Sequence, residues 1–224
     1  MRRYLPFVII AVVAFVTVGV ATTLYRSKMH PVTQPSAAVT PRPTVANEKE
    51  DESLHVRGPR NAPVTLEIYG DFQCPSCANA AAALGELEKQ YGEQLRVIFR
   101  EFPLAMHKHA VEAAMAAEAA GLQGHFWEMH DMLYKYQSVW SKASDVSRFF
   151  AAYAEAIGLD VGQFQIDAKS PAVQAGVMSE GDAGVARGVK NTPTIFINGR
   201  QIHTFMPENL RAAIDAALAE KKKS

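Results

Sequence analysis

The sequence has 224 residues, 48% of them hydrophobic and 21% charged, which is enough for one well-packed domain with additional segments. The formal net charge is zero, and the part from Leu54 onward carries 17 basic and 19 acidic residues. This balance lacks the basic excess typical of nucleic-acid-binding domains, so nucleic acid is not an expected partner. Only two cysteines occur, Cys74 and Cys77. Their spacing excludes a disulfide-stapled scaffold and indicates a local chemical or metal-binding pair.

The first segment, residues 1–26, contains an uncharged apolar run from Leu5 to Tyr25 with basic residues on both sides. About 20 such residues suffice to span a bilayer as a helix, so the run is predicted to be a transmembrane anchor. A cleaved secretory signal is the alternative. Both interpretations take the rest of the chain across a membrane, although the flanking positive charges barely decide the orientation.

Residues 27–53 form the second segment, which is rich in Pro, Thr, Ala and Val and then charged from Glu48 to Glu52. It has neither helical nor strand periodicity. Such a composition is typical of an extended, disordered linker.

The third segment, residues 54–220, is expected to be the folded domain. The β-branched and apolar content of residues 62–69 predicts a mostly buried strand that ends at Gly70 and Asp71. After Cys77, apolar residues recur at helical spacing as far as Gly92, and residues 95–99 then alternate as a strand does. The sequence therefore predicts a strand, a helix and a second strand.

From about 107 to 189 the pattern is helical almost throughout, which predicts a large helical insertion. Residues 194–197 and 200–205 read as two strands, and Asn198-Gly199 between them is the favoured two-residue hairpin turn. A last helix carries Leu210, Ile214 and Leu218 on one face.

The sequence Cys74-Pro75-Ser76-Cys77 lies where the first strand gives way to a helix. This places Cys74 at the helix start, where free backbone N–H groups and the helix dipole stabilise a thiolate. Pro75 at the first helical position removes no needed donor. Cys77, one turn into the helix, is expected to be the less exposed, resolving thiol, and Ser76 offers a hydroxyl but no charge.

Two other interpretations of the cysteine pair were weighed. A structural zinc site needs four ligands, and only His107 and His109 come close; two residues apart on a helix, they would diverge. An inert structural disulfide is the second possibility, but so short a loop gives little entropic stabilisation. No metal site is therefore expected.

Four motifs in this order resemble the DsbA-like branch of the thioredoxin superfamily. They are the redox motif after a strand, a second strand motif, an aromatic motif in the helical insertion, and Thr-Pro before the closing hairpin, at Gly70–Cys77, Phe99–Leu104, Phe126–His130 and Thr192–Thr194. The resemblance covers roughly residues 54–219. It implies an α/β thioredoxin-like fold, a central mixed β-sheet flanked by helices, with the helical subdomain inserted beside the active site.

The resemblance also implies the roles of individual residues. Pro193 would be a cis-proline lying against the redox cysteines, and Thr192 would pair through its backbone with a bound substrate chain. Pro75 and Ser76 complete the expected substrate-binding set beside the catalytic Cys74 and Cys77. The implied redox group is the Cys74–Cys77 disulfide itself, without a further cofactor.

The implied function is disulfide exchange with unfolded or partly folded extracytoplasmic proteins, by a protein expected to be monomeric. Its location would be the bacterial cell envelope, anchored with the domain in the periplasm, or released there if the first segment is cleaved. A membrane redox partner would recharge it. The favoured activity is dithiol oxidase; the alternatives are a disulfide reductase or isomerase, and a non-enzymatic binding or chaperone domain.

One position departs from the family pattern. Many relatives carry a buried acid six residues before the first cysteine, where this chain has Ile68, with Glu67 one residue earlier. Because strand side chains alternate between faces, Glu67 is expected to point away from the site.

Other conspicuous residues in the sequence are expected to be structural. The apolar side chains of the insertion motif are interpreted as packing residues: Phe126, Trp127 and Met129. Three histidines are interpreted as surface or core groups: His125, His130 and His203.

Overall fold

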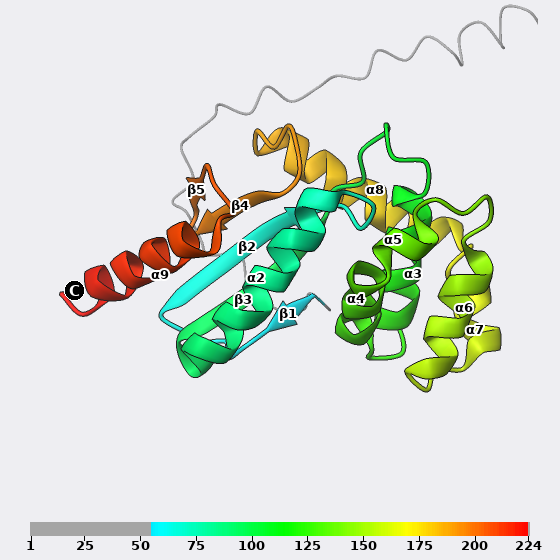
Figure 1. The fold of residues 1–224 in the computed structure, drawn as a ribbon, viewed down its shortest axis with the longest axis horizontal. Coiled ribbons are helices and arrows are strands. Elements are labelled where there is room, and N and C mark those ends of the chain that lie inside the picture. The colour runs from blue at the N-terminus through cyan, green and yellow to red at the C-terminus, as the bar shows by residue number, and fades with distance from the viewer. Residues whose placement is uncertain (1–54, 224) are drawn as a thin grey trace, which may run out of the picture. The chain divides into compact units, whose positions relative to one another are not determined.

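The computed structural model describes residues 55–223 (Figure 1). The predicted anchor of residues 1–26 and the linker of residues 27–53 lie outside these residues and stay predictions. Within residues 55–223, none of the helices combines the length and the apolar character that a bilayer crossing requires.

A five-stranded mixed sheet forms the centre of the domain, in the order β1-β3-β2-β4-β5. The strands are β1 (Val56–Arg57), β2 (Val64–Gly70), β3 (Leu95–Glu101), β4 (Thr194–Ile197) and β5 (Arg200–Ile202). β2 and β3 run parallel, and the other neighbours are antiparallel. The α2 helix makes the crossover that a parallel pair needs.

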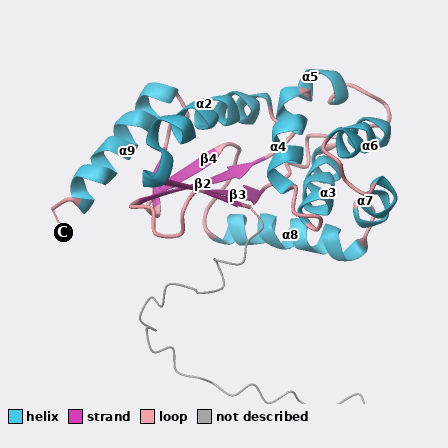
Figure 2. Ribbon diagram, turned by 90° about the horizontal axis from the view of Figure 1, so that it is seen from below, coloured by secondary structure: helices cyan, strands magenta, loops and turns pink. Residues whose placement is uncertain are grey.

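Helices cover both faces of this sheet (Figure 2). The α2 and α9 helices lie on one face and α8 on the other, while α3 to α7 gather beside the sheet. The helices are α2 (Pro75–Tyr91), α3 (Ala110–Gly121), α4 (Phe126–Lys135), α5 (Gln137–Trp140), α6 (Ser147–Ala156), α7 (Val161–Asp167), α8 (Pro171–Ala186) and α9 (Pro207–Lys221). This arrangement confirms the predicted α/β fold with a mixed sheet and flanking helices.

The core follows from this layering. Because both faces of the sheet are covered, side chains on both sides of β2 are buried, Leu66 and Ile68 toward one layer and Tyr69 toward the other. The α3 helix is buried on nearly all sides, and its run of alanines lets α4, α7 and α8 approach closely.

The predicted hairpin turn is present between β4 and β5. Asn198 and Gly199 both have positive φ, 46° and 79°, as a two-residue hairpin turn requires. The Asn198 side chain accepts a hydrogen bond from the Thr65 N–H at 2.8 Å, which fixes the hairpin to β2. Since Tyr69 of β2 pairs with Thr194 of β4, the chain just before β4 lies beside the end of β2.

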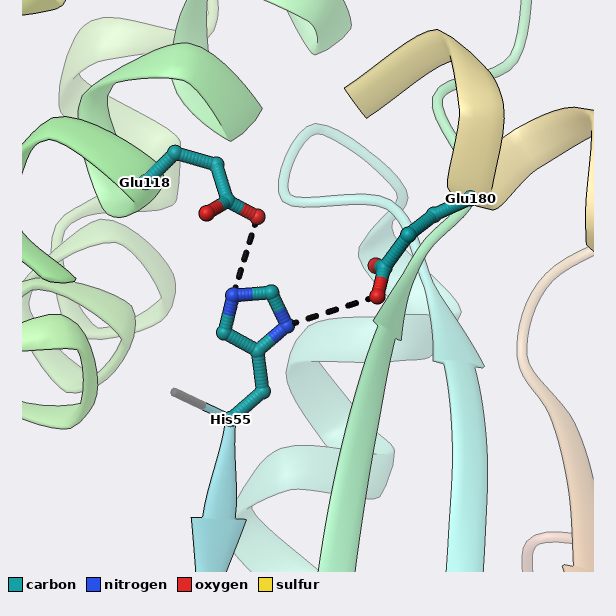
Figure 3. Close-up of side chains that lie close together, drawn as sticks. All are labelled: His55, Glu118 and Glu180. Carbon is teal, nitrogen blue, oxygen red and sulfur yellow. Dashed lines mark ion pairs between the residues drawn. The ribbon is translucent and has the colours of Figure 1, made fainter. Parts of the chain in front are cut away.

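The short strand β1 was not predicted, and this strand and the residue before it connect the sheet to four helices. His55, directly before it, lies between Glu118 of α3 and Glu180 of α8, with its two ring nitrogens 2.9 Å and 3.7 Å from their carboxylates (Figure 3). Arg57 forms ion pairs with Glu88 of α2 and Asp131 of α4.

Candidate active site

The cysteine pair occupies the start of α2, where this helix follows the C-terminal end of β2 (Figure 1). Cys74 is the N-cap residue with extended backbone angles, and Pro75 is the first helical residue. The Cys74 carbonyl accepts hydrogen bonds from the N–H groups of Cys77 and Ala78 at 3.1 and 3.2 Å. No acidic side chain lies in the first turn, so the positive end of the helix dipole acts on the Cys74 sulfur without a competing carboxylate.

Both thiols are reduced in the structure and buried, with Cys74 7% and Cys77 1% exposed. The pKa of Cys74 is lowered from 9.0 to about 5, and the largest cause is a hydrogen bond from the Cys77 thiol. Burial opposes this shift, while hydrogen bonds from Thr192 and from the backbone of Cys77 and Ser76 add to it. Burial, followed by the hydrogen bond with Cys74, raises the pKa of Cys77 far above its ordinary value. One cysteine is therefore a thiolate at neutral pH and its neighbour a thiol.

The Thr192–Pro193 peptide lies against this pair. Its bond is cis, and the Cys74 sulfur lies 3.6 Å from the Thr192 carbonyl oxygen. The pairing of β4 with β2 positions this segment at the same end of the sheet as the helix start. Pro75 is exposed, and Ser76, Thr192 and Pro193 are half-buried. The five predicted residues around Cys74 therefore come together, and all of them except Cys77 reach the surface.

The loop between β2 and α2 is held by Asp71, whose side chain is fully buried. Its carboxylate accepts hydrogen bonds from the N–H groups of Gln73 and Leu104 at 2.7 and 2.8 Å, and lies 2.7 Å from Nδ1 of His107. The Asp71 carbonyl also accepts from the Cys74 N–H at 3.1 Å. The sequence pattern marks Asp71 only as the end of a strand, although an Asp side chain commonly accepts hydrogen bonds from backbone N–H groups of such a loop.

Two glutamines complete the support of this loop, and both were missed as functional positions. The Gln137 amide of α5 donates to the carbonyls of Phe72 and Cys74 at 2.7 and 2.9 Å. Gln73 donates to the Ser141 carbonyl and accepts from the His109 N–H. The helical insertion thus holds the backbone on which Cys74 sits.

Strand alternation places Ile68 and Glu67 as expected. Ile68 is buried on the α2 face of β2. Glu67 forms ion pairs with Arg100 and with Arg187, which follows α8, on the opposite face. The acid position of the family is therefore apolar on the side of the cysteines.

The histidines predicted to diverge have separate partners. His107 contacts Asp71. One ring nitrogen of His109 contacts Glu112, and the other lies 2.9 Å from the Ala143 carbonyl. His109 therefore makes no hydrogen bond with a cysteine sulfur. Among residues 55–223, one group of side chains has the spacing of a cation site, His55 with Glu118 and Glu180 (Figure 3).

That group is better explained as a structural ion-pair network. Glu180 already receives the Arg100 guanidinium at 3.2 Å and the Glu101 N–H at 2.8 Å, one on each carboxylate oxygen. Its carboxylate approaches one ring nitrogen of His55 and that of Glu118 approaches the other, so the imidazole connects α3 and α8.

The aromatic motif of the insertion is mostly core, as predicted. Phe126 and Met129 are buried. Trp127 is half-buried, and the Arg57 guanidinium lies 4.4 Å above its ring. Behind the cysteine pair, a cavity of about 930 Å³ between α2, α4 and the sheet is lined by Cys77, Trp127 and His130 among others.

This chain belongs to the thioredoxin family, because the family model described as Thioredoxin matches residues 50–216. Its fold is that of the DsbA-like thiol-disulfide oxidoreductases, as solved structures show. BdbD from Bacillus subtilis superimposes with a TM-score of 0.66 at 22% identity, covering 73% of this chain and 92% of that one. α-DsbA1 of Wolbachia pipientis superimposes with a TM-score of 0.67 at 17% identity, covering 75% of this chain and 92% of that one.

Two further comparisons extend this result. A thioredoxin-like oxidoreductase from Silicibacter pomeroyi is 25% identical with a TM-score of 0.64, covering 78% of this chain and 99% of that one. A curated relative, Na(+)/H(+) antiporter NhaA 1 of Salinispora arenicola, is 41% identical over 167 residues, 74% of this chain. The chain spans about a quarter, 25%, of the length of that relative.

Proposed function

We propose that this protein is an extracytoplasmic thiol-disulfide oxidoreductase that oxidises dithiols in other proteins. The observation that carries the proposal is the asymmetry of the pair: the pKa of Cys74 lies near 5, while Cys77 is a buried thiol. A low pKa makes Cys74 both the sulfur that exchanges with partners and a good leaving group.

The reaction begins with the oxidised pair. A substrate thiolate attacks Sγ of Cys74, the Cys74–Cys77 bond breaks, and Cys77 leaves with the electron pair and takes up a proton. A second substrate thiolate then attacks the substrate sulfur of the mixed disulfide, the new substrate disulfide forms, and Cys74 leaves as a thiolate. Because that thiolate is stabilised, the equilibrium favours the reduced enzyme and the oxidised substrate.

The residues around Cys74 have complementary roles in this proposal. The Thr192 backbone beside cis-Pro193 pairs with the substrate chain, and the surface of Pro75 and Ser76 contacts it next to the reacting sulfur. The supporting geometry is the 3.6 Å contact between Cys74 and the Thr192 carbonyl. Substrates are unfolded or partly folded proteins, whose extended backbone is free to pair in this way.

The location and the recycling partner are part of the proposal. The apolar run at 5–25 supports export to the periplasm or anchoring in the membrane, with residues 27–53 as the linker. A membrane redox partner would reoxidise the Cys74–Cys77 pair. No cofactor beyond that disulfide is needed for the exchange steps.

The test is the equilibrium of the Cys74/Cys77 couple with glutathione, with the thiol state measured by alkylation and mass. A potential near the roughly −120 mV of strong oxidants supports the oxidase, and one near the roughly −270 mV of thioredoxin supports the alternative of a reductase. A Cys74→Ser variant that still acts on a reduced, unfolded protein as the wild type does would instead indicate a non-enzymatic binding or chaperone domain.

A further inference from the structure

The buried thiol of Cys77 has to exchange a proton in every cycle. Cys77 is 1% exposed, and burial raises its pKa, so its sulfur leaves the disulfide as a thiolate that must be protonated at once. On the side away from Cys74, however, Cys77 lines the cavity of about 930 Å³. The outer lining includes the exposed residues Lys89, Glu93 and Lys135, so the cavity reaches the surface.

The cavity contains a histidine held by a carboxylate. His130 of α4 lines it, and Nδ1 of the ring lies 2.8 Å from Oδ1 of Asp131. Since a carboxylate only accepts, Nδ1 carries the hydrogen and Nε2 has the free lone pair. Within residues 55–223, Nε2 has no hydrogen-bond partner. The other oxygen of Asp131 is 2.6 Å from the Arg57 guanidinium, which fixes the carboxylate in turn.

Tyr134 lines the same cavity as this histidine and the cysteine. Its ring centroid is 4.9 Å from that of His130, and its hydroxyl is buried without a partner in the described part of the chain. Burial, and then the charge of Cys77, raises the pKa of Tyr134. The hydroxyl can therefore hydrogen-bond to water in the cavity.

The groups that face His130 from its surroundings keep the imidazole neutral. Burial is the largest effect and lowers the pKa of His130. Asp131 opposes this effect, and electrostatic interactions with Arg57 and His55 add to it. Glu88 of α2 faces the same cavity and is paired with Arg57. On the sheet side the wall is apolar, with Ile68 where the family carries its acid.

We propose that His130, oriented by Asp131, exchanges the proton of Cys77 through water in the cavity behind the redox pair. This inference rests on the proposed disulfide exchange and names the proton path of that site. The cavity is far larger than a single water needs, and Tyr134, His130 and Cys77 supply polar contacts for water.

The proton balance is the same in both directions. When a substrate thiolate opens the disulfide, the Cys77 sulfur leaves with the electron pair. Neutral His130 takes a proton from solvent at Nε2 and passes it through water to that sulfur, so the imidazole ends neutral again. When Cys77 attacks a mixed disulfide on Cys74, its proton passes to Nε2 of His130, the Cys74–Cys77 bond forms, and the partner leaves as a thiolate. Solvent then restores neutral His130 through the open end of the cavity.

The test follows the reduced full-length protein after mixing with glutathione disulfide, with acid quenching, alkylation and mass measurement. Attack by Cys74 gives the mixed disulfide with glutathione, and attack by Cys77 resolves it, so the two rates are read separately from pH 5.5 to 8.5. We expect His130→Gln to leave the first rate unchanged and to slow the second by roughly tenfold or more, so that mixed disulfide accumulates.

Further variants separate proton transfer from packing. Asp131→Asn, a change at a half-exposed side chain, should slow the second rate in the same direction. In His130→Ala, free imidazole should enter the cavity and restore the second rate. The matched control is His125→Gln at the N-cap of the same helix, since His125 pairs with Glu128 at 3.5 Å outside the cavity. This variant should behave as the wild type.

The outcomes distinguish the two proposals. If the wild type forms no mixed disulfide with glutathione, the proposed function is wrong. If the wild type resolves its mixed disulfide and the His130 and Asp131 variants do so at the same rate, only the proton path is wrong. Equal slowing of both steps, or no rescue by imidazole, would assign His130 a purely structural role and would also overturn the inference.

Discussion

Replacing Cys77 by alanine should raise the pKa of Cys74 substantially. The largest cause of the low pKa of Cys74 is the hydrogen bond from the Cys77 side chain, and the remaining favourable contributions come from Thr192 and the start of α2. Cys77→Ala removes the first and leaves the others. Cys77→Ser is the matched variant, because its hydroxyl can donate to the same sulfur and should preserve most of the shift.

The magnitude follows from the difference between 9.0 and about 5 for Cys74. A depressed folded-state pKa stabilises the folded reduced protein by an amount that grows from the folded pKa to the unfolded pKa and is fully present above the unfolded pKa. At pH 7 the contribution spans the interval from about 5 to 7, which at about 1.36 kcal/mol per unit is on the order of 3 kcal/mol. It should disappear as the pH falls below about 5.

The assay is the pH dependence of Cys74 alkylation, read as the midpoint of the rate profile. The midpoint is used because a higher pKa lowers the fraction of thiolate but makes that thiolate more nucleophilic. In a rate measured at a single pH these two effects partly cancel. Denaturant unfolding of the reduced protein at pH 4.5 and pH 7 gives the linked stability. If Cys77→Ala titrates at the wild-type midpoint, the helix start and Thr192 set the pKa, and the argument from Cys77 fails.

Three further predictions concern the support of the site. Burial, and then the charges of Glu118, Glu180 and Asp71, raises the pKa of Glu101, so the wild type loses stability as the pH rises above 4.5, the pKa in the unfolded chain. Glu101→Gln should therefore raise the melting temperature at pH 7 by roughly 2–4 °C and change it little near pH 4. An equal rise at both pH values would refute this explanation. Asp71→Ala should cost roughly 3 kcal/mol or more in denaturant unfolding, because buried N–H groups of the loop lose their acceptor. Gly184→Ala should cost roughly 1–3 kcal/mol, since its Cβ would lie 2.8 Å from the Phe102 ring; an unchanged unfolding midpoint would show that the ring moves freely.

The parts of the fold that the sequence predicted are those with a local pattern. The strand, helix and strand around the cysteines follow from alternation and helical spacing, and Asn198-Gly199 specifies its own turn. The β1 strand has no such pattern. Two paired residues are too few for periodicity, and its contribution depends on the ion pairs of His55 and Arg57 with distant helices.

The candidate site divides in the same way. Cys74 and Cys77 are specified by their spacing and by the strand-to-helix transition, whereas Thr192 and Pro193 were identified only through the family resemblance. Gln137 could not be predicted, because it lies 63 residues from Cys74 and its role depends on where the insertion returns to the loop. Single polar residues of this kind carry no periodic signal.

His130 shows why a residue can be visible in the sequence and still be misjudged. As an isolated histidine on a helix, it is most simply a core or surface group, and its neighbour Asp131 looks like any exposed acid. What changes the interpretation is the cavity, which joins α4 to Cys77 only in the folded chain. Ile68 makes the face of β2 toward Cys77 apolar, while Glu67 is engaged by Arg100 on the other face. A strand cannot move its acid to the opposite face without a change of register. A helix of the insertion can instead place a proton-exchanging side chain, His130, across the cavity from Cys77.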